Sequence, residues 1–206
     1  MKTDPQSPSR IGRPRSVAAE SHAAILDAVY ELLHEKSVRD LSMEAVAKRA
    51  GVGKPTLYKW WPSKAALIFA MFHERMVGKL EAPPAASAEE AIRAKVRHLI
   101  GEFNGLFGKV MAELIAEGQS DQAVLQELYD SHISLRRAST IGDIERGKDA
   151  GEFPEDTDPE LLVDAIFGPM YYRLLLRLMP LTEAYGASLI DQVLRGLRAN
   201  PGRPIV

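Results

Sequence analysis

Apolar residues recur at three- and four-residue spacing along almost the whole chain, a period typical of amphipathic α-helices. The first expected helix, at about residues 16–36, has an apolar stripe made of Ile25, Ala28, Val29, Leu32 and Leu33. No segment longer than a few residues alternates between apolar and polar positions as a half-buried β-strand does. The pattern therefore predicts an all-α fold.

Helix start and stop signals divide the N-terminal part of this pattern into short helices. Ser42 stands where an N-cap is expected, and Gly51 permits a tight turn before a third helix at about residues 54–61. Pro62 ends that helix, and a fourth, linking helix is expected from Lys64 to about Leu80. The first three helices are expected to form a helix-turn-helix head.

A proline-rich break at residues 82–87 separates this head from a second group of helices. Their expected ranges are 87–106, 108–117, 121–149, 158–178 and 182–198. Residues 1–15 have no apolar period and are expected to be a disordered basic arm. The chain is therefore divided into an arm at 1–15, a helix-turn-helix domain at 16–62 and a helical C-terminal domain at 63–206.

Charge is distributed unevenly between the two ends of the chain, although the net charge is only −2. Residues 1–80 carry 13 Lys and Arg against 8 Asp and Glu, whereas residues 81–206 carry 13 against 20. A basic head on an acidic body is typical of a DNA-binding segment joined to a part that does not touch DNA. Uneven scatter of charge, as in any chain, is the alternative interpretation.

Several classes of protein are excluded by composition. The chain has no cysteine, which rules out disulfides, thiolate metal sites and a cysteine nucleophile, and favours a reducing cytoplasm. The first 20 residues lack the apolar core of a signal peptide, and no apolar run reaches the ~20 residues that span a bilayer. The five histidines form no ligand pair at helical spacing, and no catalytic constellation is visible. We expect a cytoplasmic, non-enzymatic protein without metal, cofactor or membrane contact.

Residues 41–67 are the most informative segment. Their apolar positions suit two short helices packed across a tight turn, and the other faces carry Lys54, Thr56, Tyr58, Lys59 and Trp60. A short helix that presents cations, hydroxyls and aromatic tips suits the major groove of DNA. An ordinary helical hairpin with a solvated basic face is the alternative.

This segment resembles the signature of tetracycline-repressor-type regulators. The matching residues are Ala50-Gly51-Val52, Thr56-Leu57-Tyr58, Trp60-Trp61, Pro62-Ser63-Lys64 and Leu67, and a weaker likeness extends the match to about residues 17–70. The resemblance implies a homodimeric repressor that binds palindromic double-stranded operator DNA. It also implies release by a small molecule, here expected to be apolar or amphipathic, that binds residues 63–206.

The resemblance assigns roles to individual residues of the head. Those implied to lie on or near the DNA backbone are Ser42, Met43, Tyr58, Lys59, Trp60 and Lys64. Those implied to face bases are Lys54, Pro55 and Thr56, while Trp61 is implied to pack in the core. In the arm, Arg13 and Arg15 are candidates for a narrow minor groove, with a solvated tail as an equal alternative.

The last helices also resemble the end of some family members, through Asp158-Pro159-Glu160-Leu161 and the segments 168–173 and 193–197. The resemblance implies that helices 158–178 and 182–198 pair with their copies in a four-helix dimer interface. The interface candidates are Leu174, Leu178, Ile190, Val193, Leu194 and Leu197. Burial inside one subunit is the alternative.

Aromatic and methionine side chains between the head and these helices are candidates for an effector cavity. They are Phe103, Phe107, Met111, Ile115, Tyr129, His132, Phe167, Met170 and Tyr171. Such residues at helical spacing also occur as plain core. For the whole protein, a regulator that activates or has no effector, and a helical scaffold or enzyme with an incidental basic hairpin, stay open as alternatives.

Overall fold

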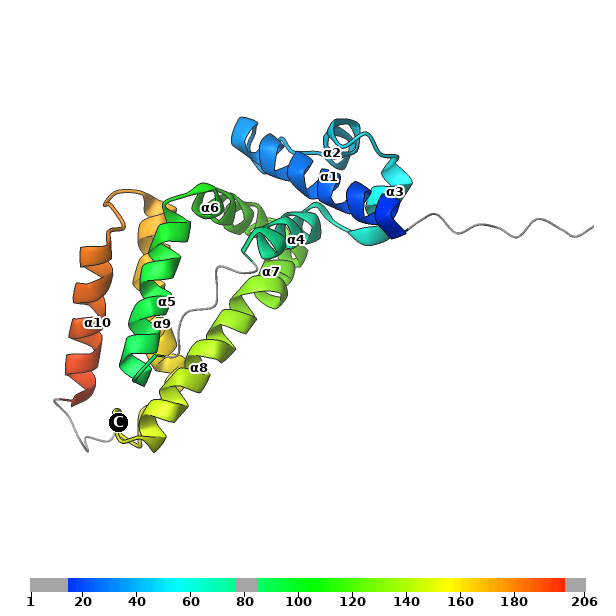
Figure 1. The fold of residues 1–206 in the computed structure, drawn as a ribbon. Coiled ribbons are helices and arrows are strands. Elements are labelled where there is room, and N and C mark those ends of the chain that lie inside the picture. Colours follow the sequence, from blue (N-terminus) through cyan, green and yellow to red (C-terminus); the bar gives the residue numbers. More distant parts are fainter. Residues whose placement is uncertain (1–14, 77–84, 199–206) are drawn as a thin grey trace, which may run out of the picture.

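The computed structural model describes residues 15–76 and 85–198, and every regular element within these ranges is a helix (Figure 1). The head consists of α1 (Arg15–Glu35), α2 (Met43–Arg49) and α3 (Lys54–Trp60), and α4 (Lys64–Met76) follows it. The body consists of α5 (Ala88–Phe103), α6 (Leu106–Gly118), α7 (Gln122–Leu128), the π-helical turn η1 (Tyr129–Ile133), α8 (Ser134–Asp149), α9 (Pro159–Leu176) and α10 (Glu183–Arg198). The prediction of an all-α fold is confirmed.

The head lies at one end of the molecule and the body at the other, with α4 between them (Figure 1). Helix α4 packs against α1 of the head and against α7 and η1 of the body. Helix α5 packs against α6, α8, α9 and α10, so it lies at the centre of the body. Helix α4 is therefore a link that touches both parts, as expected for the linking helix.

Local chemistry explains why the head folds as two short helices across a turn. The Ser42 hydroxyl accepts a hydrogen bond from the Ala45 amide at 3.2 Å, which caps the start of α2. Gly51 has a φ of 65°, a left-handed conformation that suits glycine. Val46 and Leu57, both fully buried, join α2 and α3 to the core. The turn and the cap lie where the sequence placed them.

In the segment from α7 to α8, the spacing of apolar residues predicted the helix but not a π-helical turn within it. The sequence predicted one helix over residues 121–149, and the chain is indeed helical from Gln122 to Asp149, but it contains a π-helical turn at Tyr129–Ile133. A π-helical turn contains one more residue than an α-helical turn, so it changes the direction in which the neighbouring side chains point.

The predicted end of the fourth helix at Leu80 lies outside the described residues. The domain boundary at 62/63 stays a prediction.

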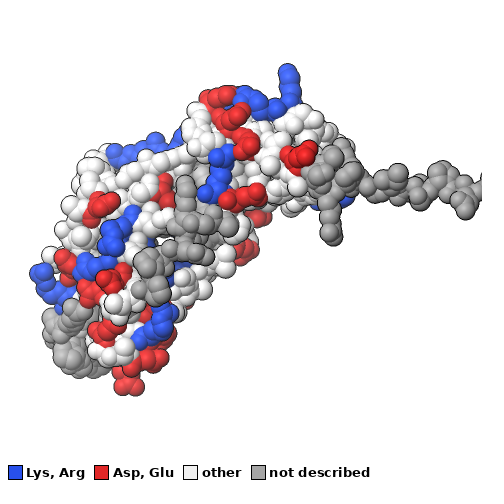
Figure 2. Space-filling model, in the orientation of Figure 1, with Lys and Arg blue, Asp and Glu red and all other residues white. Residues whose placement is uncertain are grey.

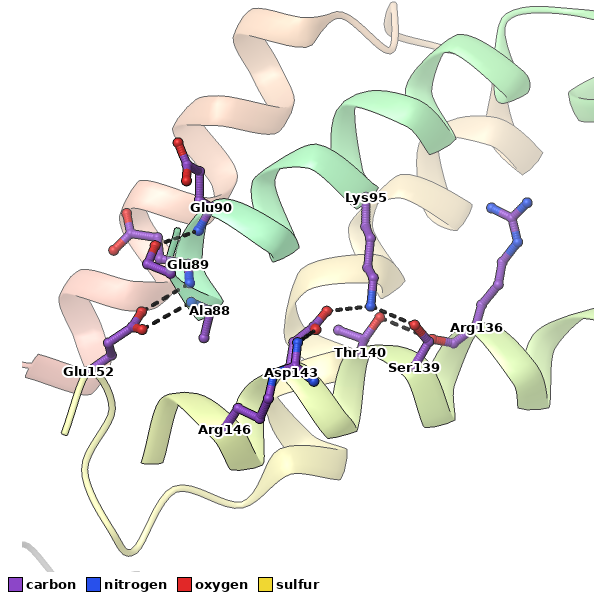
Figure 3. Close-up of polar contacts among 11 residues, drawn as sticks. Ala88, Glu89, Glu90, Lys95, Arg136, Ser139, Thr140, Asp143, Arg146 and Glu152 are labelled. Carbon is purple, nitrogen blue, oxygen red and sulfur yellow. Dashed lines mark hydrogen bonds and ion pairs between the residues drawn. The ribbon is translucent and has the colours of Figure 1, made fainter. Parts of the chain in front are cut away.

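Two polar contacts fix α5 in the body (Figure 3). Lys95 points from α5 to the buried carboxylate of Asp143 on α8 and pairs with it. At the N-terminus of α5, the Glu152 carboxylate accepts from the backbone amides of Ala88 at 3.0 Å and Glu89 at 3.2 Å. The second contact caps two amides that have no partner inside the helix.

Helix α10 approaches α5 closely because one of its residues has no side chain. A Cβ atom placed on Gly186 would lie 2.4 Å from Ile100 Cδ1 and 2.9 Å from Val96 Cγ1. In contrast, a Cβ on the exposed Gly101 of α5 would meet nothing within 4 Å.

Among the described helices, none is long and apolar enough to cross a membrane.

We predict that Gly186→Leu destabilises the protein by about 1–3 kcal/mol, because it overpacks the contact between α10 and α5. Gly101→Leu is the matched control and should leave stability unchanged or raise it slightly, since leucine favours a helix more than glycine does. Urea unfolding followed by circular dichroism measures both. Equal stabilities of the two variants would contradict the close packing at Gly186.

Candidate functional site

The outer surface of α3 carries several of the residues expected to contact DNA. Tyr58 is 50% exposed, and Pro55 and Lys59 are also exposed, while Thr56 is half-buried. Leu57 points inward and is fully buried, so it anchors the helix to the head. A short helix anchored on one side and free on the other has the form of a DNA-recognition helix. The individual DNA contacts stay predictions.

Lys54, at the start of α3, is paired inside the head. Its ammonium lies 2.5 Å from a carboxylate oxygen of Glu44, at the start of α2, and both side chains are more than half exposed. The Lys54 hydrogen bond holds the pKa of Glu44 below its usual range. Contact with a base or a phosphate would require Lys54 to exchange this partner.

The structure refines the expectations for the residues around α2 and the two tryptophans. Ser42 is exposed and caps α2, whereas the Met43 side chain is 7% exposed and packs in the core, which leaves only its backbone amide for DNA. Trp61 is also 7% exposed, in agreement with its expected core role. Trp60 is half-buried, with its ring edge-on to Trp61 and the centroids 5.6 Å apart.

Lys64 differs from the expectation that it holds a phosphate. Its ammonium donates to the Val38 carbonyl at 2.8 Å and lies 3.1 Å from a carboxylate oxygen of Glu117 on α6. The side chain is 23% exposed. Lys64 therefore joins the head to the body, and its charge is already neutralised by a partner.

Helix α6 continues this contact along one face, which we call the α6 seam: Lys109, Glu113 and Glu117. Lys109 Nζ donates to two carbonyl oxygens at the end of α1, each at 2.9 Å. The Glu113 carboxylate accepts from the Val38 amide at 2.6 Å. Residues four apart share a helix face, so these three side chains together grip the corner between α1 and α2. The seam was not predicted from the sequence, although charged residues at four-residue spacing on a mainly apolar helix indicate it.

The arm is not tested by the structure. Arg13 lies outside the described residues, and Arg15 is the first residue of α1. The proposed minor-groove contact of the two arginines stays a prediction.

A cavity of about 460 Å³ that is open to solvent lies in the body, between α6, the α7–η1 segment and α9. Its walls are formed by Ile115, Gln122, Leu125, Gln126, Leu128, Tyr129, Ile133 and Tyr171. Three of these residues, Ile115, Tyr129 and Tyr171, were among the cavity candidates. The other five were not predicted. Periodicity within one helix does not show which residues of several helices line a common cavity.

Other cavity candidates belong to the core beside this cavity rather than to its wall. They are Phe103, Phe107, Met111 and Met170, each at most 6% exposed, and the half-buried Phe167. The Phe103 ring contacts the wall residue Tyr171, with centroids 5.1 Å apart. His132 lies against Phe107, with centroids 4.8 Å apart. Burial lowers the pKa of His132 to about 3, so its ring is neutral at physiological pH.

A partly buried ion pair lies next to these aromatic rings. Arg136 of α8 binds both carboxylate oxygens of Glu102 on α5, at 2.7 and 3.0 Å. The Glu102 side chain is only 11% exposed, and His98 Nε2 lies 3.0 Å from it. Burial raises the pKa of the nearby Tyr171 phenol. Of these polar groups, only Tyr171 was identified in the sequence as a candidate for a site.

The dimer candidates fall into two groups. Leu174, Ile190 and Leu194 are at most 7% exposed within a single chain, so they have almost no surface left for a second copy. This corrects their assignment to the interface: they hold α9 and α10 in the body. Val193 and Leu197 are half-buried, and Leu178 is 78% exposed.

A different face of α9 presents apolar side chains to solvent, and we call it the α9 stripe: Leu161, Ala165, Gly168, Tyr172 and Leu175. All five residues are exposed, with Leu161 at 57% and Tyr172 at 56%. Their spacing alternates between four and three residues, as in the contact face of two paired helices. A large exposed apolar patch of this kind marks an interaction surface.

The charge on the visible face of the molecule is mixed. In Figure 2, Lys and Arg side chains alternate with Asp and Glu over both the head and the body, without one continuous basic surface. Arg49, for example, is held by Glu31 and Glu35. Local pairing therefore breaks up the positive charge of the head, although its net basic excess remains.

The helix-turn-helix head and the all-helical body define a DNA-binding transcriptional regulator. Residues 25–71 match the model for bacterial regulatory proteins of the tetR family, and residues 82–193 match the model for a tetracyclin repressor-like C-terminal domain. The chain is 35% identical over 191 residues to the HTH-type transcriptional regulator YdeS of Bacillus subtilis, covering 93% of this chain and 96% of that one. The chain belongs to the tetracycline-repressor family of regulators, which are not enzymes.

Further similarities agree with this assignment. The HTH-type transcriptional regulator EthR of Mycobacterium tuberculosis is 27% identical over 177 residues, which cover 81% of each chain. Among solved structures, the TetR family regulator SCO0332 aligns with a TM-score of 0.72 and 31% identity over 86% of this chain and 98% of that one. A regulator FadR from Bacillus subtilis, solved in complex with stearoyl-CoA, aligns with a TM-score of 0.68 and 22% identity over 85% of this chain and 98% of that one.

We predict that Lys59→Met and Lys64→Met, which remove the same charge, have different effects. Lys59→Met should reduce the slope of log affinity for DNA against log salt by about one, because it removes one phosphate contact. Lys64→Met should leave that slope unchanged. It should instead lower the unfolding free energy by about 1–3 kcal/mol, since partly buried, charged hydrogen bonds to Val38 and Glu117 are lost.

Fluorescence anisotropy with labelled DNA at several salt concentrations and thermal unfolding together measure the two effects. A reduced salt slope in Lys64→Met with unchanged stability would show that Lys64 contacts a DNA phosphate, as the family resemblance implied.

Proposed function

We propose that this protein is a homodimeric repressor that works in the cytoplasm and leaves its palindromic operator when a small molecule binds the body. The observation that carries this proposal is the double role of α6. Ile115 forms part of the cavity wall, while the α6 seam, on the opposite face of the same helix, grips the head. A change at the cavity therefore acts on the DNA-binding head through one rigid element.

The seam gives the proposed switch a physical path. A molecule that fits the cavity in only one position of α6 selects that position, and the corner between α1 and α2 moves with it through Glu113 and Lys109. The ligand shifts the equilibrium only by the difference between its affinities for the two states. A shift from 1:99 to 99:1 needs about 5.5 kcal/mol of such difference. By linkage, operator DNA weakens ligand binding by the same factor.

Similar proteins support a small-molecule effector in general terms. The FadR structure contains stearoyl-CoA, and another structure of similar fold, with a TM-score of 0.62 and 24% identity, is of the flavonoid-responsive regulator FrrA. The two molecules differ widely in chemistry. These similar proteins thus support a body that binds a small molecule, but they do not indicate the chemical class of that molecule.

The α9 stripe supports the proposed dimer. Two copies that place this stripe face to face would bury Leu161, Tyr172 and Leu175, which one copy leaves in water. Ala165 and Gly168 are small, and open space surrounds Gly168, so two helices can approach closely there. The resulting two-fold symmetry would set two heads on half-sites about 34–36 Å apart.

We predict that the protein retards DNA from the region upstream of its own gene, and that Thr56→Ala reduces its preference for that DNA over a scrambled fragment by about tenfold, as expected for the loss of a base contact. Electrophoretic mobility shifts with both fragments measure the preference. Tyr129→Ala, in the cavity wall, is the control and should keep it. Equal affinity of the wild-type protein for both fragments would refute the proposed repressor.

We predict that Leu175→Glu produces folded monomers with weakened operator binding, because a charge in the α9 stripe cannot be buried between two copies. Leu135→Glu, at a leucine that is 66% exposed outside the stripe, should stay dimeric. The same change at Leu194, which is 2% exposed, should unfold the chain instead. Light scattering and circular dichroism distinguish the three outcomes, and a dimeric Leu175→Glu would exclude the stripe as the interface.

A further inference from the structure

The contact between Glu44 and Lys54 joins the beginnings of the two helices that form the helix-turn-helix. Glu44 is the second residue of α2, and Lys54 is the first residue of α3. A carboxylate oxygen of Glu44 lies 2.5 Å from the Lys54 ammonium, and the two side chains are 54% and 53% exposed. A carboxylate therefore lies beside the lysine that begins the proposed recognition helix.

Helix stability explains the position of Glu44 but not that of Lys54. The amides at the start of a helix carry partial positive charge, so a carboxylate in the first turn is favourable and an ammonium there is unfavourable. The first turn of α3 contains no acidic residue, and its N-cap, Gly53, makes no side-chain hydrogen bond. The place of Lys54 therefore points to a role outside α3, and Glu44 offsets its charge in the absence of DNA.

The second lysine of α3 is in a different state. Lys59 is exposed in the last turn of the helix, and no residue that the structure describes forms an ion pair with it. A free ammonium attracts any DNA phosphate, whatever the base sequence, whereas the pair of Glu44 and Lys54 has no net charge. Of the two lysines, Lys59 is thus the one that can bind the DNA backbone without giving up a protein partner.

A contact between Lys54 and DNA breaks the pair and leaves Glu44 without its cation. An exposed ion pair is weakly held, so this exchange can occur. A phosphate accepts hydrogen bonds and is negatively charged, so it binds Lys54 but repels the freed carboxylate. The edge of a base pair is uncharged and offers partners to both groups. In a G·C pair, for example, guanine presents the acceptors N7 and O6, and cytosine presents an amino donor.

We propose that Glu44 is a specificity-determining residue, which makes Lys54 favour the edge of a base pair over a phosphate. This inference rests on the proposed function, in which α3 contacts the operator. Glu44 penalises the sequence-independent contacts of Lys54. At the correct base pair, its carboxylate accepts a hydrogen bond while Lys54 donates one.

Glu44→Gln tests this role, because it keeps the size of the side chain and removes its charge. On a scrambled DNA fragment at about 0.1 M salt, the variant should bind about fivefold more tightly than the wild type. Its slope of log affinity against log salt should steepen by about one, since Lys54 gains one phosphate contact. Its preference for the DNA upstream of its own gene should fall by at least about fivefold. Fluorescence anisotropy at several salt concentrations measures all three quantities.

Glu35→Gln is the matched control in the same head. The Glu35 side chain is 50% exposed, and its partner Arg49 is also paired with Glu31, so the substitution releases no cation. The control removes the same charge as Glu44→Gln and should leave the salt slope and the preference unchanged.

A double variant shows whether the effect passes through Lys54. When Glu44→Gln is added to Lys54→Met, it should no longer steepen the salt slope, because the cation that it would release is gone. A purely structural role of Glu44 at the start of α2 predicts the opposite sign, since a weakened α2 would lower the affinity for every DNA fragment.

An unchanged salt slope of Glu44→Gln on scrambled DNA overturns the inference, and this measurement needs no operator. An equal change in Glu35→Gln, or a steeper slope that persists in the double variant, overturns it as well. So does a Glu44→Gln protein that keeps the full preference of the wild type. The proposed repressor fails on different evidence, namely equal affinity of the wild-type protein for upstream and scrambled DNA, so the two failures are distinguishable.

Discussion

The grip of α6 on the corner between α1 and α2 is the interaction on which the arrangement of this protein depends. Val38 lies at that corner with its side chain fully buried, its amide bound by Glu113 and its carbonyl bound by Lys64. Lys109 binds two more carbonyl oxygens at the end of α1, which have no partner inside the helix. Because these contacts satisfy backbone groups directly, the head cannot move relative to α6 without breaking them, so it follows α6 when that helix shifts.

The same principle of local neutralisation recurs through the molecule. Lys54 pairs with Glu44 in the head, Lys95 with Asp143 in the body and Arg136 with Glu102 beside the cavity. In the two body pairs, partly exposed cations satisfy the nearly buried carboxylates of Asp143 and Glu102, which could not stay charged in the interior without a partner. A contact between Lys54 and DNA, which stays a prediction, would therefore require Lys54 to exchange its partner Glu44.

Local features of the head were predictable because their causes lie within a few residues. The cap at Ser42 and the turn at Gly51 follow from side-chain chemistry and spacing, and the inward position of Trp61 agrees with what the family resemblance implied. Lys64 was not predictable in the same way. Its partner Glu117 is 53 residues away, so its sequence context gave no sign that its charge was already used.

The amino-acid sequence by itself determined the helical fold, the helix-turn-helix head and the family, since these depend on periodicity and on one compact motif. Tertiary structure decided which apolar face of each C-terminal helix is free. Leu194 and Leu175 both belong to apolar stripes, but only the first packs inside the chain. Tertiary structure also decided the cavity wall, which α6, α7, η1 and α9 build together. Periodicity shows that a helix has an apolar face, and only the packing of helices shows what that face meets.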